Sequence, residues 1–459
     1  MKILYVVHYY LPRHQAGTEL YTQALARKFK EEGHRVWIFT SEDQAQPGWE
    51  LKKDIYEEIE VFRIYHSGAR DFRSTYQREE FDRIFARVLE QIQPEVVHFQ
   101  HLLRLSLGFI AEAKKRNMPA LMTLADYWLI CPAIIMLKPE DQPCASPEQG
   151  RACVRCAHSL SGMIPNLLWQ MPGVFQRASE RALAYAHQIK RQLPPGWVEW
   201  LREVLGKKAE QEKKSRLLSQ RWEEMKKAVS QLDLIISPSR FLREMMISSG
   251  MVPEEKIIYS DYGFESRGFL PRDRFKSPGE PLILGFIGTL VRHKGVHILI
   301  QALKYLEGEN LELRIYGSLE EFPGYVRWLK KLADKDKRIK WMGRAEHSQV
   351  PEVLKEIDLL VVPSLWYENS PLTIHEGFLA RLPVLASNLG GMKELVREGR
   401  GGMLFEANNP KNLAEKIRMF IKNPELIPCL KCGTPPVKTI EQNYKELLQL
   451  YEKIKKAGN

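Results

Sequence analysis

The sequence predicts an α/β protein made of two doubly wound domains, each with a parallel sheet. Strand–loop–helix–strand units occur near both ends of the chain, over residues 2–39 and 358–391. Two apolar segments are also repeated: ILGFIG at 283–288 resembles ILYVV at 3–7, and DLLVVPS at 358–364 resembles DLIISPS at 233–239. A chain of 459 residues is too long to fold around one compact core. Two domains with the same layout are therefore the simplest account of the repeats.

The first domain is expected over residues 1–264 and opens with a buried strand at residues 3–7. A long loop ends at Gly17, Thr18 can cap the helix that runs to residue 32, and Gly33 stops that helix. Residues 36–39 form the next strand. The loop carries a single glycine and not a G-x-G-x-x-G pattern, which argues against a dinucleotide site.

Further along, residues 61–65 form a strand and residues 81–93 an amphipathic helix that Pro94 ends. The next strand, EVVHFQHL, places His98 and His101 near a strand end, where α/β proteins bind ligands. The alternative is that each histidine is a buried or surface residue without a chemical role.

Four cysteines follow within one loop, and two of them form a C-x2-C pair. They are Cys131, Cys144, Cys153 and Cys156. That spacing suits a tetrahedral structural zinc, and unligated thiols are the alternative. A second C-x2-C, Cys429 and Cys432, is interpreted as incidental because no other cysteine pair lies near it in the sequence.

Residues 161–230 are interpreted as a helical insertion that carries much of the positive charge. They hold 13 Lys and Arg against 7 Asp and Glu, within a chain of net charge +11, and several tryptophans. Basic amphipathic helices with aromatic residues suit an anionic membrane surface, and nucleic acid is a second candidate. The alternative without a binding role is a solvated helical insertion that covers the sheet.

The first domain ends with strands at residues 233–239 and 256–260, and residues 265–280 are expected to be a linker. The second domain, over residues 281–439, opens with a strand that ends at Gly288. Arg292 and Lys294 then precede a helix, and cations beside a helix N-terminus can neutralise a diphosphate. A strand over residues 311–316 and another before Gly343 and Arg344 follow.

The most informative stretch runs from residue 358 to 391. Residues 359–362 form a buried strand, Ser370 and Pro371 are expected to cap and begin a helix, and residues 384–386 form another strand. Glu368 and Glu376 flank the helix start with seven residues between them. A helix N-terminus favours phosphate, whereas carboxylates beside it suit hydroxyl groups such as those of a ribose or a sugar. Two solvated glutamates are the alternative.

These residues carry a resemblance to a known family. PSLWYENSPLTIHEGFLARLPVLASNLGGMKELV resembles the E-x7-E signature of family-4 retaining glycosyltransferases of the GT-B fold, and the likeness extends upstream to GTLVRHKGVHILIQAL. The resemblance implies two Rossmann-like domains that face each other across a cleft. It also implies that the final helix, residues 440–459, packs back on the first domain.

The resemblance assigns roles to individual positions. Lys294, helped by Arg292, would hold the diphosphate, and Glu368 would bind hydroxyls of the donor sugar. The other donor-binding positions would be Gly17, Gly288, Thr289, Gly343, Arg344, Ser370, Pro371, Leu372 and Glu376, the last of these on the ribose. His98 and Asp126 would lie on the acceptor side.

Two positions depart from the family pattern. Ala125 stands where a histidine is common, and Thr289 stands where an arginine is usual. Arg292 is close enough in sequence to replace that arginine, which is a hypothesis.

The expected function is transfer of a sugar, with retention of configuration, from a UDP- or GDP-sugar to a glycan or lipid-linked acceptor. We expect no cofactor and no metal for catalysis, with zinc in a structural role only, and no nucleic acid as partner. Two alternatives remain: a GT-B nucleotide-sugar epimerase, and a catalytically degenerate subunit that binds the nucleotide sugar. The start MKILYVVHYYLP has too short an apolar run for a signal peptide, and no segment reaches the length of a membrane span. A cytoplasmic protein is therefore expected, peripheral at the inner face of the membrane if the basic insertion binds lipid.

Overall fold

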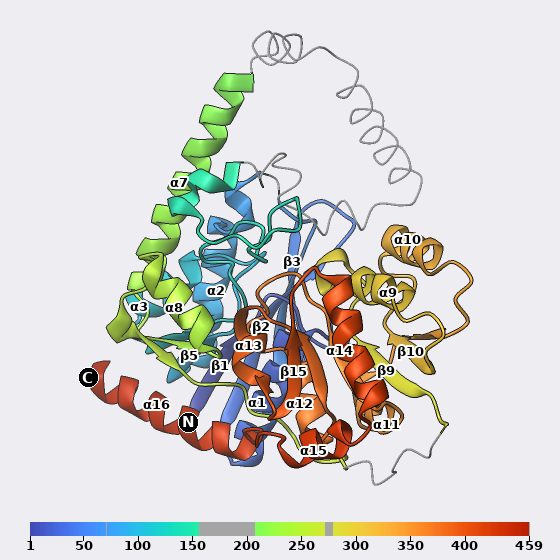
Figure 1. Cartoon of the computed structure of the whole chain (residues 1–459). Coiled ribbons are helices and arrows are strands. Elements are labelled where there is room, and N and C mark those ends of the chain that lie inside the picture. The colour runs from blue at the N-terminus through green and yellow to red at the C-terminus, as the bar shows by residue number, and fades with distance from the viewer. Residues whose placement is uncertain (70, 155, 157–206, 271–278, 459) are drawn as a thin grey trace.

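The computed structural model describes residues 1–69, 71–154, 156, 207–270 and 279–458. Two mainly parallel sheets, each covered by helices, form two domains that lie against each other (Figure 1). The prediction of an α/β protein with two doubly wound domains is confirmed. The exact domain boundaries stay a prediction, because half of the expected linker, residues 271–278, lies outside the described residues.

The first sheet has the strand order β3-β4-β2-β1-β5-β6-β7-β8. Its strands are β1 (Lys2–Val6), β2 (Arg35–Asp43), β3 (Trp49–Tyr56), β4 (Ile59–His66), β5 (Val96–Phe99), β6 (Ala120–Thr123), β7 (Leu234–Ser237) and β8 (Ile257–Tyr259). Its helices are α1 (Gly17–Glu31), α2 (Glu79–Ile92), α3 (Gly108–Lys115), α7 (Lys207–Ser230) and α8 (Arg240–Ser248).

Strand β3 was not predicted, and its residues explain why. It pairs antiparallel with β4 at the edge of the sheet, whereas the other strand pairs of this sheet are parallel. Most of its side chains are exposed, including Ile55 at 71%. A strand shows alternating apolar residues in its sequence because one of its faces is buried. An exposed, charged edge strand lacks this alternation, so it is hard to predict from the sequence.

The second sheet has the strand order β11-β10-β9-β12-β13-β15-β14. Its strands are β9 (Leu282–Ile287), β10 (Leu311–Tyr316), β11 (Ile339–Gly343), β12 (Leu359–Val362), β13 (Val384–Ser387), β14 (Arg397–Glu398) and β15 (Gly401–Phe405). Its helices are α9 (Val296–Lys304), α10 (Pro323–Ala333), α11 (Val350–Lys355), α12 (Leu372–Leu379), α13 (Gly390–Leu395), α14 (Pro410–Lys422) and α15 (Leu426–Cys432).

The central strands of each sheet are buried on both faces, with a hydrophobic cluster on either side. The strand order reverses between β1 and β5 in the first sheet and between β9 and β12 in the second. These are the topological switch points, beside which doubly wound sheets bind their ligands at the carboxyl ends of the strands. The loops that follow the strands of both sheets meet at the domain interface.

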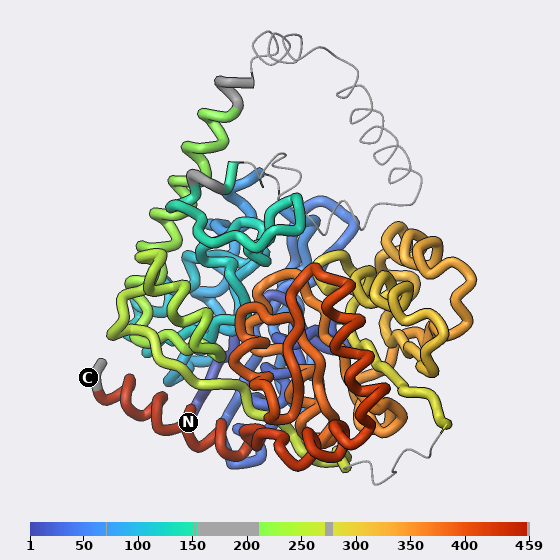
Figure 2. The backbone as a smooth tube through the Cα atoms, viewed as in Figure 1, coloured from blue at the N-terminus to red at the C-terminus, as the bar shows by residue number. Residues whose placement is uncertain are grey.

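The final helix, α16 (Ile440–Gly458), returns to the first domain and packs on α1. Tyr21 donates a hydrogen bond of 2.8 Å to Asn443, and the hydroxyls of Tyr5 and Tyr451 lie 3.2 Å apart. The two ends of the chain consequently lie on the same side of the molecule (Figure 2).

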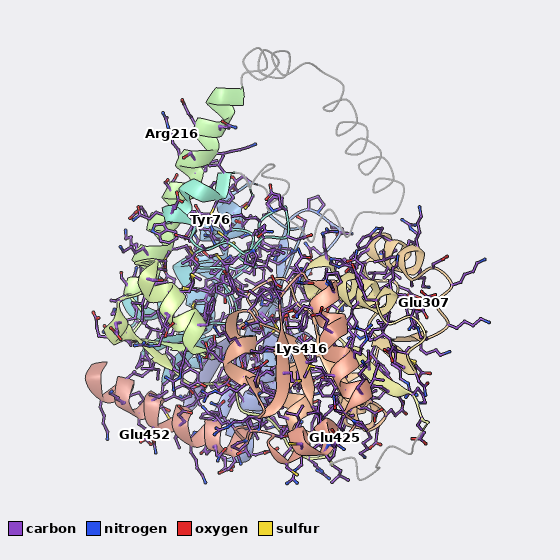
Figure 3. All side chains as sticks on the ribbon, in the orientation of Figure 1. Tyr76, Arg216, Glu307, Lys416, Glu425 and Glu452 are labelled. Carbon is purple, nitrogen blue, oxygen red and sulfur yellow. The ribbon has the colours of Figure 1, made fainter. Side chains whose placement is uncertain are left out.

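Only part of the predicted basic insertion can be placed. Residues 161–206 lie outside the described residues, and residues 207–230 form α7, one end of which extends beyond the body of the first domain (Figure 1). Leu218 and Trp222 bury the other part of the helix against the domain, whereas Arg216 is exposed on the projecting part (Figure 3). Within the described part of the chain, no helix is both long enough and apolar enough to cross a membrane.

Candidate active site

Asn369 fastens the loop between β12 and α12 to the first domain. Its Nδ2 donates to the carbonyl oxygens of Leu124 (3.2 Å) and Ala125 (3.3 Å), and its Oδ1 accepts from the Ser239 hydroxyl (2.6 Å). The side chain is 4% exposed, and a carboxamide is suited to this place because it both donates and accepts. Sequence reasoning did not single out Asn369, although it lies directly beside Glu368.

Lys294 and Glu368 form an ion pair at the switch point of the second sheet. Lys294 Nζ lies 2.7 Å from Glu368 Oε1, which also accepts from the Ser364 hydroxyl at 2.7 Å. Burial alone would raise the pKa of Glu368, but the charge and hydrogen bond of Lys294, together with Ser364, lower it below its usual value. The structure thus brings these two predicted residues together, with a buried carboxylate held ionised by a partly exposed amine.

The position of Lys294 is fixed by the glycine that follows it. Gly295 has φ +73°, and a Cβ at this position would lie 1.8 Å from the carbonyl oxygen of Pro363. Only glycine allows this close approach, which holds the loop after β9 against the end of β12.

Arg292 and Lys294 belong to the same short 3₁₀ turn but face different partners. Arg292 Nε lies 3.0 Å from both carboxylate oxygens of Asp141, in the cysteine loop of the first domain. Its guanidinium also lies over the ring of Trp328, 5.6 Å from the centroid. The hypothesis that Arg292 replaces the family arginine therefore requires it to exchange Asp141 for a diphosphate.

The N-termini of α1 and α12, one from each domain, are in contact. A Cβ on Gly17 would lie 3.3 Å from Leu372 Cδ1, so the two helix starts touch. The N-cap residues, Ala16 and Pro371, make no side-chain capping hydrogen bond within the described structure. Two helix dipoles thus place their positive ends at one point of the interface.

The prediction that Ser370 caps the helix is wrong. The helix begins at Leu372, with Pro371 at the N-cap. The Ser370 hydroxyl instead donates to Asp261 Oδ1 (2.7 Å) and lies 2.8 Å from His375 Nε2. The hydroxyl is drawn away from the helix by a carboxylate near the end of β8, a partner that local sequence does not reveal.

Gly390 and Gly391, at the start of α13, pack against the loop that carries Glu368 and Asn369. The Gly391 amide donates to the Glu368 carbonyl at 2.8 Å. A Cβ on Gly391 would lie 1.6 Å from the Asn369 carbonyl oxygen, so a side chain here would displace the loop that carries both residues.

Glu376 lies inside α12 and is 5% exposed. His347 Nε2 lies 3.1 Å from its Oε1, and this hydrogen bond raises the pKa of His347. Arg344, on the loop after β11, reaches the first domain: its Nη2 lies 3.4 Å from Gln15 Oε1. Glu376 and Glu368 have separate partners, as expected if each carboxylate serves a different part of a ligand.

Gly288, Thr289 and Gly343 lie at the carboxyl ends of β9 and β11. Gly288 donates its amide to the Tyr316 carbonyl, and the Gly317 amide donates to the Gly343 carbonyl at 2.8 Å. Thr289 is exposed in the loop that leads to Lys294.

The placement of His98 on the acceptor side is corrected by the structure. His98 is fully buried in β5, where Nδ1 lies 2.7 Å from the Tyr451 hydroxyl and Nε2 lies 2.8 Å from Thr123 Oγ1. Burial lowers its pKa to about 3. It is a core histidine that joins the sheet to α16, because its side chain points to the face that α16 covers.

His101, three residues after His98, lies in the loop after β5 and contacts Asp126, the other residue predicted on the acceptor side. Its Nδ1 accepts from the Leu103 amide (2.9 Å), so Nε2 carries the proton and donates to Asp126 Oδ2 (3.1 Å). The rings of His101 and His8 lie 4.6 Å apart, and His8 Nε2 lies 3.5 Å from Glu19 Oε1. We call Glu19, His8, His101 and Asp126 the His8 cluster.

The four cysteines lie in one region but do not form a metal site in this geometry. Cys131, Cys144 and Cys153 are buried in the same hydrophobic cluster. Among the described residues, which include all four cysteines, no three potential ligands are arranged to hold a metal ion. Structural zinc therefore stays a prediction.

The sequence analysis did not consider one Asp-x-Asp pattern, which is formed by Asp334 and Asp336. Asp334 and Asp336 follow α10, and Asp336 is engaged by Arg338 at 2.9 Å. The ion pair to Arg338 gives Asp336 a structural partner at the end of the helix.

Comparison with known proteins adds two family matches. Residues 271–446 match the family described as glycosyl transferases group 1, and residues 16–139 match the family described as glycosyltransferase family 4. Among curated relatives, an uncharacterized glycosyltransferase of Methanocaldococcus jannaschii is 34% identical over 145 residues, which is 31% of this chain and 38% of that protein. The amylovoran biosynthesis glycosyltransferase AmsK of Erwinia amylovora is 26% identical over 240 residues, 49% of this chain and 57% of the relative. The chain thus spans about half of the length of such relatives.

Solved structures resemble the whole chain. HepE of Anabaena, in complex with UDP and glucose, has a TM-score of 0.63 at 16% identity and covers 98% of this chain and 99% of its own. Sucrose-phosphate synthase of Thermosynechococcus elongatus has a TM-score of 0.64 at 15% identity, with 99% of each chain covered. At such identities the likeness shows the fold.

Proposed function

The chain belongs to the family-4 glycosyltransferases and has their two-domain GT-B fold, and from this premise we propose that it transfers a sugar from a nucleotide diphosphate sugar to a hydroxyl acceptor. UDP-sugars are the first donors to test, because HepE, which shares the fold, was solved with UDP and with UDP-glucose. GDP-sugars are the second choice. The transfer is proposed to retain the anomeric configuration.

The observation that carries the proposal is the meeting of the α1 and α12 N-termini at Gly17 and Leu372, one from each domain. Helix N-termini bind phosphate through free amides and the dipole. Their joint presence at the interface suits a diphosphate held between two domains.

The residues around this point divide into those suited to phosphate and those suited to hydroxyls. Lys294 supplies a cation that can neutralise charge as the nucleoside diphosphate leaves. Glu368 is ionised and can accept from hydroxyls of the donor sugar, and Glu376 can accept from the ribose. Both carboxylates now have partners, Lys294 and His347, which a bound donor would share or displace.

A thermal-shift panel of nucleotide sugars tests the donor. A ligand at one hundred times its dissociation constant stabilises the folded state by about 2.7 kcal/mol, so the true donor should raise the melting temperature clearly. Glu376→Ala should weaken this binding by roughly 1.5–3 kcal/mol, the worth of a hydrogen bond to a charged group. Glu352→Ala, on the exposed part of α11, is the matched control. An unchanged affinity in Glu376→Ala would remove Glu376 from the donor site.

A catalytically degenerate subunit that binds the nucleotide sugar is the second candidate. The pairing of Arg292 with Asp141 favours it, because the arginine proposed to replace the family residue is engaged elsewhere. Release of free nucleoside diphosphate from the bound donor distinguishes the two: turnover supports the transferase, and tight binding without turnover supports the degenerate subunit.

We extend the proposal to reversible association with an anionic membrane surface, which would present a lipid-linked acceptor. Its support is the excess of Lys and Arg in residues 161–230 and the exposed Arg216 on the projecting part of α7. Each basic residue near an anionic leaflet contributes about 1 kcal/mol.

A further inference from the structure

Strand β3 leaves one edge of the first sheet open. It ends the strand order of that sheet, and no further strand pairs with it among the described residues. The strand is eight residues long, whereas β8, at the opposite edge, has three. The backbone N–H and C=O groups along a long free edge are a template for another strand, and added strands are a common mode of protein recognition.

Three large apolar side chains are exposed on one face of β3. Trp49, Leu51 and Ile55 are 42%, 36% and 71% exposed, and their spacing places them on the same face of the strand. On the neighbouring strand β4 this face belongs to the core, since Ile64, which pairs with Leu51, is buried. The apolar face of the sheet therefore extends beyond its covered part, and contiguous exposed apolar side chains of this kind mark interaction sites.

A second copy of this chain matches the open edge of β3. Two identical strands that pair antiparallel about a two-fold axis place their residues symmetrically about one central position. With Lys53 at that centre, Leu51 of each copy faces Ile55 of the other. On the opposite face of the sheet, Lys52 of each copy faces Asp54 of the other. This register covers the exposed apolar side chains and joins opposite charges, and each pair occurs twice.

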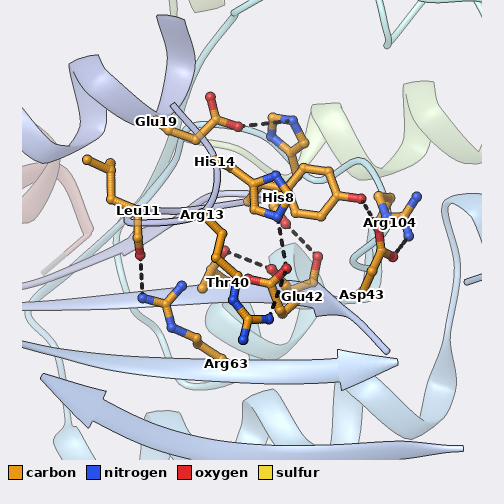
Figure 4. Close-up of polar contacts among 12 residues, drawn as sticks. His8, Leu11, Arg13, His14, Glu19, Thr40, Glu42, Asp43, Arg63 and Arg104 are labelled. Atoms are coloured by element: carbon orange, nitrogen blue, oxygen red, sulfur yellow. Dashed lines mark hydrogen bonds and ion pairs between the residues drawn. The ribbon is translucent and has the colours of Figure 1, made fainter. Parts of the chain in front are cut away.

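The charges near the axis are already held by partners within each chain. Lys53 Nζ lies 2.5 Å from Glu60 Oε1, which balances the two lysines that meet at the centre. Arg63 of β4 donates from Nε to Asp54 Oδ2 at 2.6 Å and from Nη2 to the Leu11 carbonyl at 2.5 Å (Figure 4). Asp54 is thus fixed at the edge, and within the described structure its Oδ1 is left to accept from Lys52 of a second copy.

Neighbouring registers are less favourable. A centre at Lys52 would place Glu50 of each copy opposite Asp54 of the other, and a centre at Asp54 would place that carboxylate opposite its own copy. Like charges directly opposite each other destabilise a strand pair. The sequence of β3 therefore specifies one symmetric pairing along the strand.

From these features we propose that two copies of this chain associate through β3, so that their first sheets join into one continuous sheet across a two-fold axis. Each copy contributes a single strand, so the interface is small and its occupancy depends on protein concentration. No residue proposed to bind the donor and no member of the His8 cluster lies on β3. The inference is consequently independent of the proposed function.

Sedimentation equilibrium of the full chain over a range of protein concentrations is the first measurement. We expect the average mass to rise with concentration from that of one chain, 53.4 kDa, toward that of two. A mass that stays at one chain at every concentration would overturn the inference and leave the edge to an extended segment of another protein.

Variants of the exposed side chains connect association to this register. Leu51→Glu and Ile55→Lys each place a charge opposite an apolar side chain twice per dimer, and each should raise the dimer dissociation constant about ten-fold. The double variant places glutamate opposite lysine at both positions and should regain most of the association. Tyr305→Lys, which replaces a side chain that is 52% exposed on the second domain, is the matched control and should associate as wild type.

The double variant separates this pairing from a general loss of apolar surface. If polarity alone mattered, the double variant would associate more weakly than either single variant. That result, or an equal weakening by Tyr305→Lys, would place the interface elsewhere and overturn the inference. Melting temperatures close to that of wild type confirm that each variant is folded, as expected for substitutions of exposed side chains.

Discussion

At the scale of single residues, environment separates the groups suited to chemistry from those that hold the fold. Glu368 and His98 are both buried, yet Glu368 has a charged partner and His98 has two neutral hydroxyl partners. The spacing of Glu368 and Glu376 could be read from the sequence, because a family motif fixes it. The burial of His98 could not, since its partner Tyr451 lies 353 residues away.

Lys294→Ala should slow turnover more than it weakens donor binding. The charge that Lys294 neutralises grows as the nucleoside diphosphate leaves, and loss of one such stabilising group costs roughly 10²–10³ in kcat. The kcat and the donor dissociation constant are measured separately, with Lys304→Ala, exposed at the end of α9, as the control. Equal losses in binding and rate would instead mark Lys294 as a group that binds the ground state.

His98→Gln should reduce the loss of stability between pH 7 and pH 5. Burial lowers the pKa of His98 from 6.5 to about 3, so between these values the unfolded state binds more protons and stability rises with pH. Glutamine cannot titrate, and the variant should lose about 2 kcal/mol less than wild type over this interval. Denaturant unfolding at both pH values measures it.

His347→Gln is the control of opposite sign. The pKa of His347 is raised by its hydrogen bond to Glu376, so its contribution is present at low pH and is lost as pH rises through the raised pKa. The variant should lose more stability than wild type on going to pH 5. Parallel pH curves for wild type and His98→Gln would contradict the account of His98.

At the scale of elements, the sequence predicted what packs locally and missed what is set across the interface. The buried strands β1, β9 and β12 follow from apolar runs of strand length. The start of α12 was misplaced because Asp261 attracts the Ser370 hydroxyl, and Asn369 was overlooked because its partners Leu124, Ala125 and Ser239 lie far away in sequence.

Asp141→Asn should tighten binding of the nucleoside diphosphate if Arg292 serves the diphosphate. The exposed Arg292–Asp141 pair must be given up on binding, and such a pair is worth about 0.2–1 kcal/mol, or a change of up to about five-fold in dissociation constant. Isothermal titration calorimetry measures the dissociation constant. In an Arg292→Ala background, Asp141→Asn should no longer tighten binding. An affinity that neither substitution alters would remove Arg292 from the donor site and leave the pair as an interdomain contact.

The cysteine loop should contain one zinc per chain if the prediction from the C-x2-C spacing holds. Four thiolates around one tetrahedral zinc need a closer arrangement than the described geometry has, so metal binding would have to draw the loop together. Elemental analysis of protein purified without added metal measures this. Substoichiometric zinc with four titratable thiols would exclude the site, and donor affinity should be unaffected by removing the metal.

At the scale of the whole molecule, the two domains are joined by side chains that a ligand must pass or replace. Asn369, Ser370 and Arg292 all reach from the second domain to the first. The fold could be predicted because each domain repeats one layout. The side-chain contacts that join the domains could not, since each of them pairs residues that lie far apart in the sequence.

The basic insertion predicts binding to anionic vesicles that weakens with salt. Lys and Arg near an anionic leaflet act through a field that is screened within about 10 Å at 0.1 M salt. Sedimentation with anionic and with neutral vesicles, at low and at high ionic strength, measures it. Binding to neither kind of vesicle, or binding that ignores salt, would count against this mechanism and favour a soluble acceptor.

The central claim is that a nucleotide diphosphate sugar binds where the N-termini of α1 and α12 meet. The most direct test is a crystal structure of the protein with the nucleoside diphosphate that gives the largest thermal shift. The account predicts the diphosphate within hydrogen-bonding distance of Lys294 Nζ and of the first-turn amides of α12, with the ribose at Glu376. A nucleotide bound away from Lys294 and α12 would contradict it.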